Sequence, residues 1–309
     1  MTGRFEIPAG LAAQRRLGPE WVTWLDGLTA RTGDLLDAWE LTVDGASMHG
    51  YCSLVLPVTT AAGEPAALKV ALPDEESEHE ALALQRWGGR GAVRLLRADQ
   101  HRRAMLLERL RPTDLTSVGD VEACEIVGGL YRRLHIPAPP QLATVTSYVE
   151  RWVDALARLP RAAPIPHRMV AQAVGLAREL VAGSGFDGRL VHGDLHQHNV
   201  MAGEREPWLV IDPKAMSGDP HYEPAPMLWN KWEAVLASGN ARWAIRQRLD
   251  AIVDAGELDP HRARDWVIVR MILNAHWTLE DAANAHRALT NDEHEWITLC
   301  LTVAKAVQE

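Results

Sequence analysis

The sequence contains little cysteine. Only three of its 309 residues are cysteines, Cys52, Cys124 and Cys300, and they lie far apart. An odd and scattered set offers neither a disulfide framework nor the spacing of a zinc site. We therefore expect three free thiols in a reducing compartment.

Long apolar runs are also missing. Nowhere do about 18 apolar residues follow one another, which is the length a membrane-spanning helix needs. The first 16 residues lack the shape of a signal peptide, and the chain shows no internal repeat or low-complexity tract. The sequence predicts a cytoplasmic protein with no membrane partner.

The chain has no excess of basic residues, and its formal net charge is −9. Binding to a phosphate backbone needs a basic stripe, so we expect no nucleic acid partner. An acidic balance is compatible with a cationic small-molecule ligand. Phenylalanine is scarce, with two residues against twelve tryptophans, and we expect tryptophan to fill core positions instead. We expect the protein to be a monomer or a weak dimer.

The first hundred residues alternate between short β-like runs and turn signals. This pattern predicts strands at 39–43, 51–58, 66–71, 93–97 and 104–108. It predicts a helix at 73–87, with acidic residues in its first turn and Gly88-Gly89 at its end.

After Pro112 the apolar spacing becomes helical. Helices are predicted at 120–135, 144–159 and 167–181 and through most of 223–307, with short strands at 190–191, 200–202 and 208–211. We therefore predict an α+β fold of two lobes. A small β-rich lobe with an N-terminal helical extension covers 1–108, a linker covers 109–118, and a larger helical lobe covers 119–309.

One segment carries most of the chemical signal. It runs from His192 through Gly193 and Asp194 to Asn199, and Asp212 follows 13 residues later. Phosphoryl transfer requires positioning and charge neutralisation more than covalent chemistry, and Mg²⁺ prefers a few oxygen ligands. In this interpretation Asp194 orients an acceptor hydroxyl and takes its proton, while Asn199 and Asp212 hold the metal.

This spacing resembles the aminoglycoside phosphotransferase and protein-kinase-like superfamily, and within it the aminoglycoside/hydroxyurea resistance kinases. The stretches that carry the closer resemblance are Met105-Leu106-Leu107-Glu108-Arg109-Leu110, Leu134-His135, Pro137-Ala138-Pro139-Pro140, Arg205-Glu206-Pro207-Trp208-Leu209, Ile211-Asp212-Pro213 and Gly218-Asp219-Pro220. The resemblance covers most of the chain, from about Trp39 to Asp281.

The resemblance implies a bilobal protein-kinase-like fold that binds ATP and Mg²⁺ between its lobes, with 1–108 as the nucleotide-binding lobe. Lys69 resembles the strand lysine that grips the α- and β-phosphates, and its partner would be Glu80, with Glu76 as a rival. The loop at 44–50 lies where a phosphate-covering loop belongs, and Ser47 or a nearby backbone amide in it would donate to phosphate. Backbone groups of Glu108 and Leu110 would contact the adenine edge.

The resemblance also implies the reaction: transfer of phosphate to the 6-hydroxyl of streptomycin. Hydroxyurea, an amino sugar and another antibiotic are the alternative acceptors. Glu223 either shapes the active site or is an acid at a helix N-terminus. The remaining substrate candidates share one helix face at i, i+3 and i+4 spacing, where carboxylates would match a cation, although a solvated polar face is the competing interpretation. They are Asn274, Trp277, Glu280 and Asp281.

Two functions of other classes compete with a kinase. His192, His196 and His198 together with Asp194 would suit a transition-metal hydrolase. A pseudokinase-like binding module would keep the fold without the reaction. The set of Lys69 and Asp194 with the predicted metal ligands favours the kinase.

Overall fold

The computed structural model describes residues 5–182 and 187–308, which form two compact units. The N-terminal unit contains the chain through Pro112 together with Ala202–Asp212. The helical unit contains Thr113–Met201 and the chain from Pro213 onward. An antiparallel sheet in one unit and helices in the other confirm the predicted α+β class. The predicted outer bounds, residues 1 and 309, lie outside the described residues.

A six-stranded antiparallel sheet forms the framework of the N-terminal unit. Its strands pair in the order β1-β3-β4-β6-β5, and β2 pairs with β3 beside β1. The strands are β1 (Thr42–Val43), β2 (Met48–His49), β3 (Ser53–Thr59), β4 (Pro65–Ala71), β5 (Leu95–Asp99) and β6 (Ala104–Glu108). The turn between β3 and β4 falls between the strands predicted at 51–58 and 66–71.

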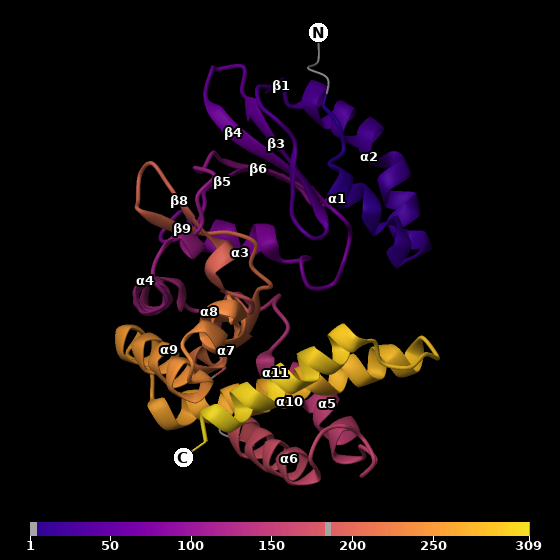
Figure 1. The fold of residues 1–309 in the computed structure, drawn as a ribbon. Helices are drawn as coiled ribbons and strands as arrows, with labels where there is room; N and C mark the ends of the chain where they lie inside the picture. Colours follow the sequence, from indigo (N-terminus) through magenta and orange to yellow (C-terminus); the bar gives the residue numbers. More distant parts are fainter. Residues whose placement is uncertain (1–4, 183–186, 309) are drawn as a thin grey trace. The chain divides into compact units, whose positions relative to one another are not determined.

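One face of this sheet is covered by α2 (Pro19–Ala38), which follows the short α1 (Ala9–Ala12) (Figure 1). Alternate residues of the strands, including Leu56 and Leu68, are buried in one cluster with the leucines and tryptophans of α2. Successive side chains of a strand point to opposite faces. Lys69, next to Leu68, therefore lies on the face that α2 does not cover.

The strand predicted at 39–43 is wrong over its first three residues. The helix α2 runs to Ala38, and the Trp39 amide still donates to the Leu35 carbonyl at 3.0 Å. Trp39 is 8% exposed and belongs to the core cluster. Only Thr42 and Val43 form a strand, because the turn that closes α2 occupies the residues before them. Glu40 is left-handed, with a φ angle of 54°, and the Leu41 amide donates to the Leu36 carbonyl at 2.8 Å.

The helix predicted at 73–87 begins seven residues later, as α3 (Glu80–Trp87). The Asp74 carboxylate accepts hydrogen bonds from the amide and the hydroxyl of Ser77, which folds this segment into a local turn. Aspartate competes in this way with helical backbone bonding. The predicted end is confirmed, because Gly88 adopts the left-handed conformation that terminates α3.

The helical unit contains most of the predicted helices within two residues of their expected ends. Its helices are α4 (Asp120–Leu134), α5 (Val145–Ala157), α6 (His167–Ala182), α7 (Ala225–Trp229), α8 (Trp232–Ala237), α9 (Ala241–Gly256), α10 (Pro260–Asn284) and α11 (Asn291–Ala306). The helix α10 packs against α6 and α11 (Figure 1). Its residues 266–273 are all buried. Two strands, β7 (Arg189–Val191) and β10 (Met216–Gly218), pair antiparallel within this unit.

The segment Ala202–Asp212 packs with the N-terminal unit, although it lies about a hundred residues farther along the chain. Its strand β9 (Trp208–Val210) follows β8 (Val200–Ala202). The Val93 amide donates to the Val210 carbonyl, and the Val210 amide donates to the Gly91 carbonyl, each at 2.9 Å. Arg205 in the same segment binds the Glu108 carboxylate at the end of β6. These contacts place Asp212, two residues after β9, in the unit that contains Lys69.

The helices of the described ranges include none that is both long enough and apolar enough to span a membrane.

Candidate functional site

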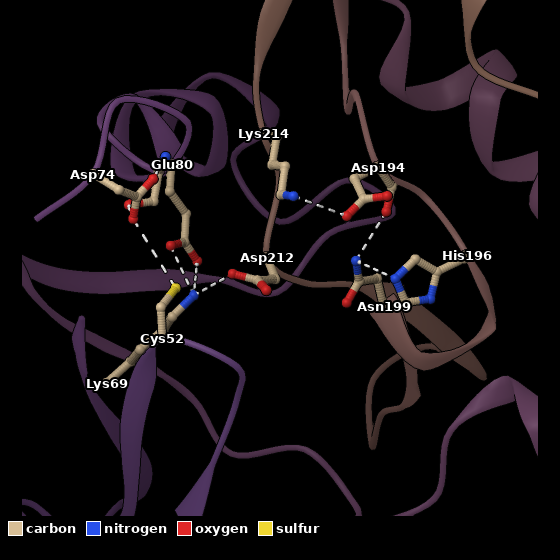
Figure 2. Close-up of polar contacts among 10 residues, drawn as sticks. Cys52, Lys69, Asp74, Glu80, Asp194, His196, Asn199, Asp212 and Lys214 are labelled. Carbon is tan, nitrogen blue, oxygen red and sulfur yellow. Dashed lines mark hydrogen bonds and ion pairs between the residues drawn. The ribbon is translucent and has the colours of Figure 1, made fainter. Parts of the chain in front are cut away.

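A buried ion-pair cluster is formed by Lys69, Glu80 and Asp212 (Figure 2). Lys69 extends from the face of the N-terminal sheet that α2 does not cover. The Lys69 ammonium donates to both carboxylate oxygens of Glu80, at 2.7 and 2.8 Å, and to Asp212 Oδ1 at 2.5 Å. The side chains of Lys69 and Glu80 are 8% and 3% exposed, whereas that of Asp212 is 49% exposed. The partner of Lys69 on α3 is therefore Glu80, and the third member of the cluster presents a carboxylate to solvent.

The charges of this cluster determine its protonation. Burial lowers the pKa of the Lys69 ammonium, but the carboxylates of Glu80 and Asp212 outweigh burial and raise that pKa above its ordinary value. Burial raises the pKa of Glu80, and the negative charge of Asp212 adds to this effect against the opposing charge of Lys69. Lys69 is therefore a fixed cation at neutral pH, which suits a group that binds phosphate.

Asp212 has an unusual backbone conformation. Its φ angle is +57°, and aspartate is one of the few residues that visit the left-handed region. Backbone strain of this kind is concentrated at functional sites. The conformation turns the chain directly after β9 and directs one carboxylate oxygen to Lys69, as Figure 2 shows.

The segment 44–50, expected as the loop that covers phosphate, contains the short strand β2 near its end. Its first residue, Asp44, is held by Arg109. Arg109 donates to the Asp44 carboxylate at 2.7 Å and to the carbonyl oxygens of Ala66 and Val58. Ser47 lies in this loop and is half-buried. Its role toward phosphate stays a prediction.

The residues expected to contact adenine follow β6. The Glu108 amide donates to the Arg94 carbonyl at 3.0 Å, and the Glu108 carboxylate binds Arg205 and the Arg94 amide. A contact from Glu108 to adenine would therefore use its carbonyl oxygen. Leu110 is partly buried two residues farther on.

In the helical unit, the loop 192–199 brings Asp194 and Asn199 together (Figure 2). Asn199 Nδ2 donates to the Asp194 carbonyl at 2.9 Å and lies 3.3 Å from His196 Nε2. Burial lowers the pKa of His196 to about 4, so its ring is neutral at pH 7, and its Nδ1 accepts a hydrogen bond from the His198 amide at 3.3 Å. The hydrogen bond to the Asp194 carbonyl engages the amide nitrogen of Asn199, so Oδ1 is the atom of this side chain that would ligate Mg²⁺, which prefers oxygen.

The backbone of Gly193 is held from two sides. Its amide donates to Glu223 Oε1 at 2.7 Å, and its carbonyl accepts a hydrogen bond from the guanidinium of Arg270 on α10. Arg270 also donates to the Tyr222 carbonyl at 3.0 Å and lies over the Tyr222 ring. The loop that presents Asp194 is therefore fixed by residues 30 and 77 positions away.

Glu223 lies beneath the loop. Its side chain is 0% exposed, and its Oε2 is 3.8 Å from His135 Nε2. Burial raises the pKa of this carboxyl, but the neighbouring His135 ring and the Gly193 amide outweigh burial and hold the pKa below its ordinary value. Its burial and its bond to the Gly193 amide favour a role in shaping the loop, and its contact with a substrate stays a prediction.

Lys214 is a residue that the sequence interpretation missed. Its ammonium lies 3.4 Å from Asp194 Oδ2 (Figure 2). A lysine two positions after Asp212, in a chain with four lysines and 28 arginines, was the available signal.

The three histidines of the loop do not converge on one point. His192 is buried, and its Nδ1 accepts from the Asp194 amide at 3.3 Å. His198 Nδ1 instead lies 2.8 Å from the carboxylate of Asp114. Across residues 5–182 and 187–308 there is no group of three or more histidine, cysteine or acidic side chains that could hold a metal ion. The loop geometry therefore does not favour the metal-hydrolase alternative.

The substrate candidates near the C-terminus lie along α10. The Trp277 ring packs edge-on against Tyr148 and Trp152 of α5, with centroids 5.6 and 6.0 Å apart. Asn274 and Glu280 are partly buried and Asp281 is exposed. The four residues share one helix, as the spacing predicted, and their contact with a substrate stays a prediction.

The family model for aminoglycoside/hydroxyurea antibiotic resistance kinases matches residues 38–282. The chain belongs to this family. It is 40% identical to a streptomycin 6-kinase of Streptomyces griseus, covering 90% of this chain and 92% of that protein. It is 41% identical to a hydroxyurea phosphotransferase of Kitasatospora aureofaciens, covering 89% of this chain and 81% of that protein.

The fold is similar to that of a solved aminoglycoside phosphotransferase, APH(4)-Ia, in a ternary complex with ADP and hygromycin B. The TM-score is 0.58 at 15% identity, with 89% of this chain and 97% of that chain covered. The predictions of a kinase-like fold and of a small-molecule kinase are thereby confirmed for this member of the aminoglycoside/hydroxyurea kinases.

Proposed function

We propose that this kinase transfers the γ-phosphoryl group of ATP to a hydroxyl of an aminoglycoside, with the 6-hydroxyl of streptomycin as the leading acceptor. The observation that carries this proposal is the 40% identity to a streptomycin 6-kinase over 90% of the chain. A similarity that covers most of both proteins includes the segments that bind the acceptor as well as those that bind the nucleotide.

In this proposal Lys69 binds the α- and β-phosphates and Glu80 holds its ammonium in place. Asn199 and Asp212 provide oxygen ligands for Mg²⁺, which would neutralise phosphate charge during transfer. The pairing of Lys69 with Glu80 and Asp212 supports this assignment, because it keeps the lysine charged and oriented. Ser47, and backbone groups of Glu108 and Leu110, complete the proposed nucleotide contacts.

Asp194 is the proposed catalytic base. The acceptor hydroxyl gives its proton to the Asp194 carboxylate while its oxygen forms a bond to the γ-phosphorus. The bond from that phosphorus to the bridging oxygen breaks, and its electron pair leaves on ADP. The side chain of Asp194 is 23% exposed, so an acceptor can reach a carboxylate whose backbone is held by the surrounding loop.

The proposed acceptor site includes α10. Glu280 and Asp281 would attract the guanidinium or amino groups of an aminoglycoside, since charged hydrogen bonds of this kind are about twice as strong as neutral ones. Hydroxyurea is the second candidate, supported by the 41% identity to a hydroxyurea phosphotransferase. It carries no cationic group, so these two carboxylates favour the aminoglycoside.

The test is ATP consumption by the purified protein with Mg²⁺ and a panel of acceptors: streptomycin, other aminoglycosides, hydroxyurea and simple amino sugars. Streptomycin-dependent ADP formation, with phosphate located on the 6-hydroxyl by NMR, is the expected result. Asp194→Asn should lower the rate by about 10²–10⁴-fold, because general-base catalysis contributes that much. If hydroxyurea alone stimulated ATP consumption, hydroxyurea would be the substrate in place of streptomycin. ATP binding without transfer to any acceptor would indicate the pseudokinase-like module.

A further inference from the structure

Lys214 has a position that the proposed function has not yet used. Its side chain is 46% exposed and its ammonium lies 3.4 Å from Oδ2 of Asp194. A partly exposed ion pair of this kind contributes about 0–1 kcal/mol to stability. Stabilisation of the fold is therefore a weak reason for a lysine at this place.

The backbone places Lys214 beside the loop. The strands β10 and β7 are paired with Met216 opposite Val191. Continuing this register by two residues sets Lys214 opposite Gly193. The two segments come so close there that a Cβ on Gly193 would lie 2.3 Å from the Lys214 carbonyl oxygen. The lysine is thus held next to the proposed base by a strand pair and a tight backbone contact.

The contact with Asp194 places the Lys214 ammonium where it can also bind an anionic group that enters the site. A transferred phosphoryl group is such a group, because negative charge is spread over its three equatorial oxygens.

The geometry of the reaction brings that group within reach. The acceptor oxygen must lie about 2.6–3.2 Å from the carboxylate that takes its proton. The phosphorus forms its new bond to the same oxygen, so the phosphoryl oxygens lie beside Asp194 during transfer. An ammonium 3.4 Å from the Asp194 carboxylate can reach them by rotation of its flexible stem.

We propose that Lys214 is a catalytic residue that donates hydrogen bonds to the phosphoryl group while it passes to the acceptor hydroxyl. This inference rests on the proposed function of Asp194 as the base. No proton leaves Lys214 in the step: the hydroxyl proton goes to Asp194 and the leaving electron pair goes to ADP. A lysine suits this task because its compact ammonium can change partners, whereas a guanidinium is a rigid planar fork.

The test compares Lys214→Met, Lys214→Arg and the wild type. Lys305→Met is the matched control, because Lys305 is an exposed lysine on α11 in the same unit. We expect Lys214→Met to lower kcat by roughly 10²-fold, the typical cost of removing one donor that stabilises transition-state charge. The Kd for ATP should stay within about threefold, since the contact forms only during transfer. Lys214→Arg should retain part of the activity, and Lys305→Met should match the wild type.

A second measurement separates chemistry from structure. The ratio of rates with ATP and with ATPγS should fall in Lys214→Met, because its missing cation no longer distinguishes oxygen from sulfur on the γ-phosphorus. A kcat of Lys214→Met within about threefold of the wild type, or a loss confined to ATP binding, would overturn the role of Lys214. Phosphorylation of streptomycin by the wild type would still leave the proposed function intact. If the wild type phosphorylates another acceptor, the comparison is made with that acceptor. A wild type that transfers phosphate to no acceptor would overturn both.

Discussion

Gly193→Ala should inactivate this kinase even though it adds a single methyl group. Gly193 has a φ angle of +81°, a region that L-residues other than glycine rarely adopt. A Cβ at this position would lie 2.3 Å from the Lys214 carbonyl oxygen, while ordinary contact begins at 3.4 Å. Either the loop 192–199 or the segment at Lys214 must therefore move by about 1 Å.

Neither segment can move without losing other contacts. The Gly193 amide is bound to Glu223 and its carbonyl to Arg270, while Lys214 is held by the pairing of β10 with β7. A displacement of about 1 Å in a reacting group can cost about 10²-fold in rate. The left-handed conformation costs alanine about 1–2 kcal/mol, and the overlap adds about 1–3 kcal/mol. We expect kcat to fall roughly 10²-fold and stability to fall by about 2–5 kcal/mol.

The assay measures phosphorylated product at saturating ATP and acceptor, together with urea denaturation of the same preparations. Gly129→Ala is the matched control. Gly129 lies inside α4, and nothing is within 4 Å of a Cβ built on it. The same substitution there should leave kcat unchanged and stabilise the protein by about 0.5–1 kcal/mol, because alanine is the better helix former.

The two variants are expected to change stability in opposite directions, which makes the reasoning testable. If Gly193→Ala kept kcat within about threefold of the wild type, the loop would tolerate a shift and its backbone contacts would not set the position of Asp194. If both variants lost the same stability, the effect would come from added volume in general and not from the contact with Lys214.

Two further predictions concern buried and exposed carboxylates. Glu223→Gln should lower kcat about tenfold and stability by about 1.5–3 kcal/mol, because the Gly193 amide loses a charged acceptor. Steady-state kinetics and urea titration measure the two effects. An unchanged kcat would show that Glu223 is structural only. Glu293→Gln should lower the urea midpoint at neutral pH. Arg287 and the Thr290 amide hold the pKa of Glu293 at about 2, below its ordinary 4.5. The stabilisation by ionised Glu293 is therefore full above about pH 4.5 and is lost as pH falls toward 2. The difference in urea midpoint between wild type and Glu293→Gln should shrink between pH 5 and 3. A difference that stays constant over this range would contradict the role given to Glu293.

Much of the fold could be predicted from local signals. The strand 104–108 and the strand 200–202 have the predicted bounds, and Thr144 caps α5 at the predicted start. These elements can be recognised from apolar spacing, caps and turns within a few residues. The pairing of Lys69 with Glu80 was also predictable, since a lysine amid apolar strand residues requires a nearby carboxylate.

The remaining features depend on contacts between distant residues. The three-residue strand β10 exists through its pairing with β7, which no local pattern indicates. The helix α2 continues to Ala38, and Trp39 after it enters the sheet core. Arg270 was overlooked, although a charge inside the apolar run 267–273 was a usable signal: burying it requires partners, and here they are carbonyl oxygens and aromatic rings.

The position of Asp194 illustrates why its neighbours were harder to predict than the residue itself. The motif from His192 to Asn199 specifies the groups that take part in chemistry, and its spacing is visible in the sequence. The geometry of the motif is instead imposed by backbone contacts with Glu223, Lys214 and Arg270, which come from three separate segments. Because a catalytic carboxylate must be held within a fraction of an ångström, replacing Arg270 on α10, which donates to the Gly193 carbonyl, should slow the reaction although it lies 77 positions from the loop.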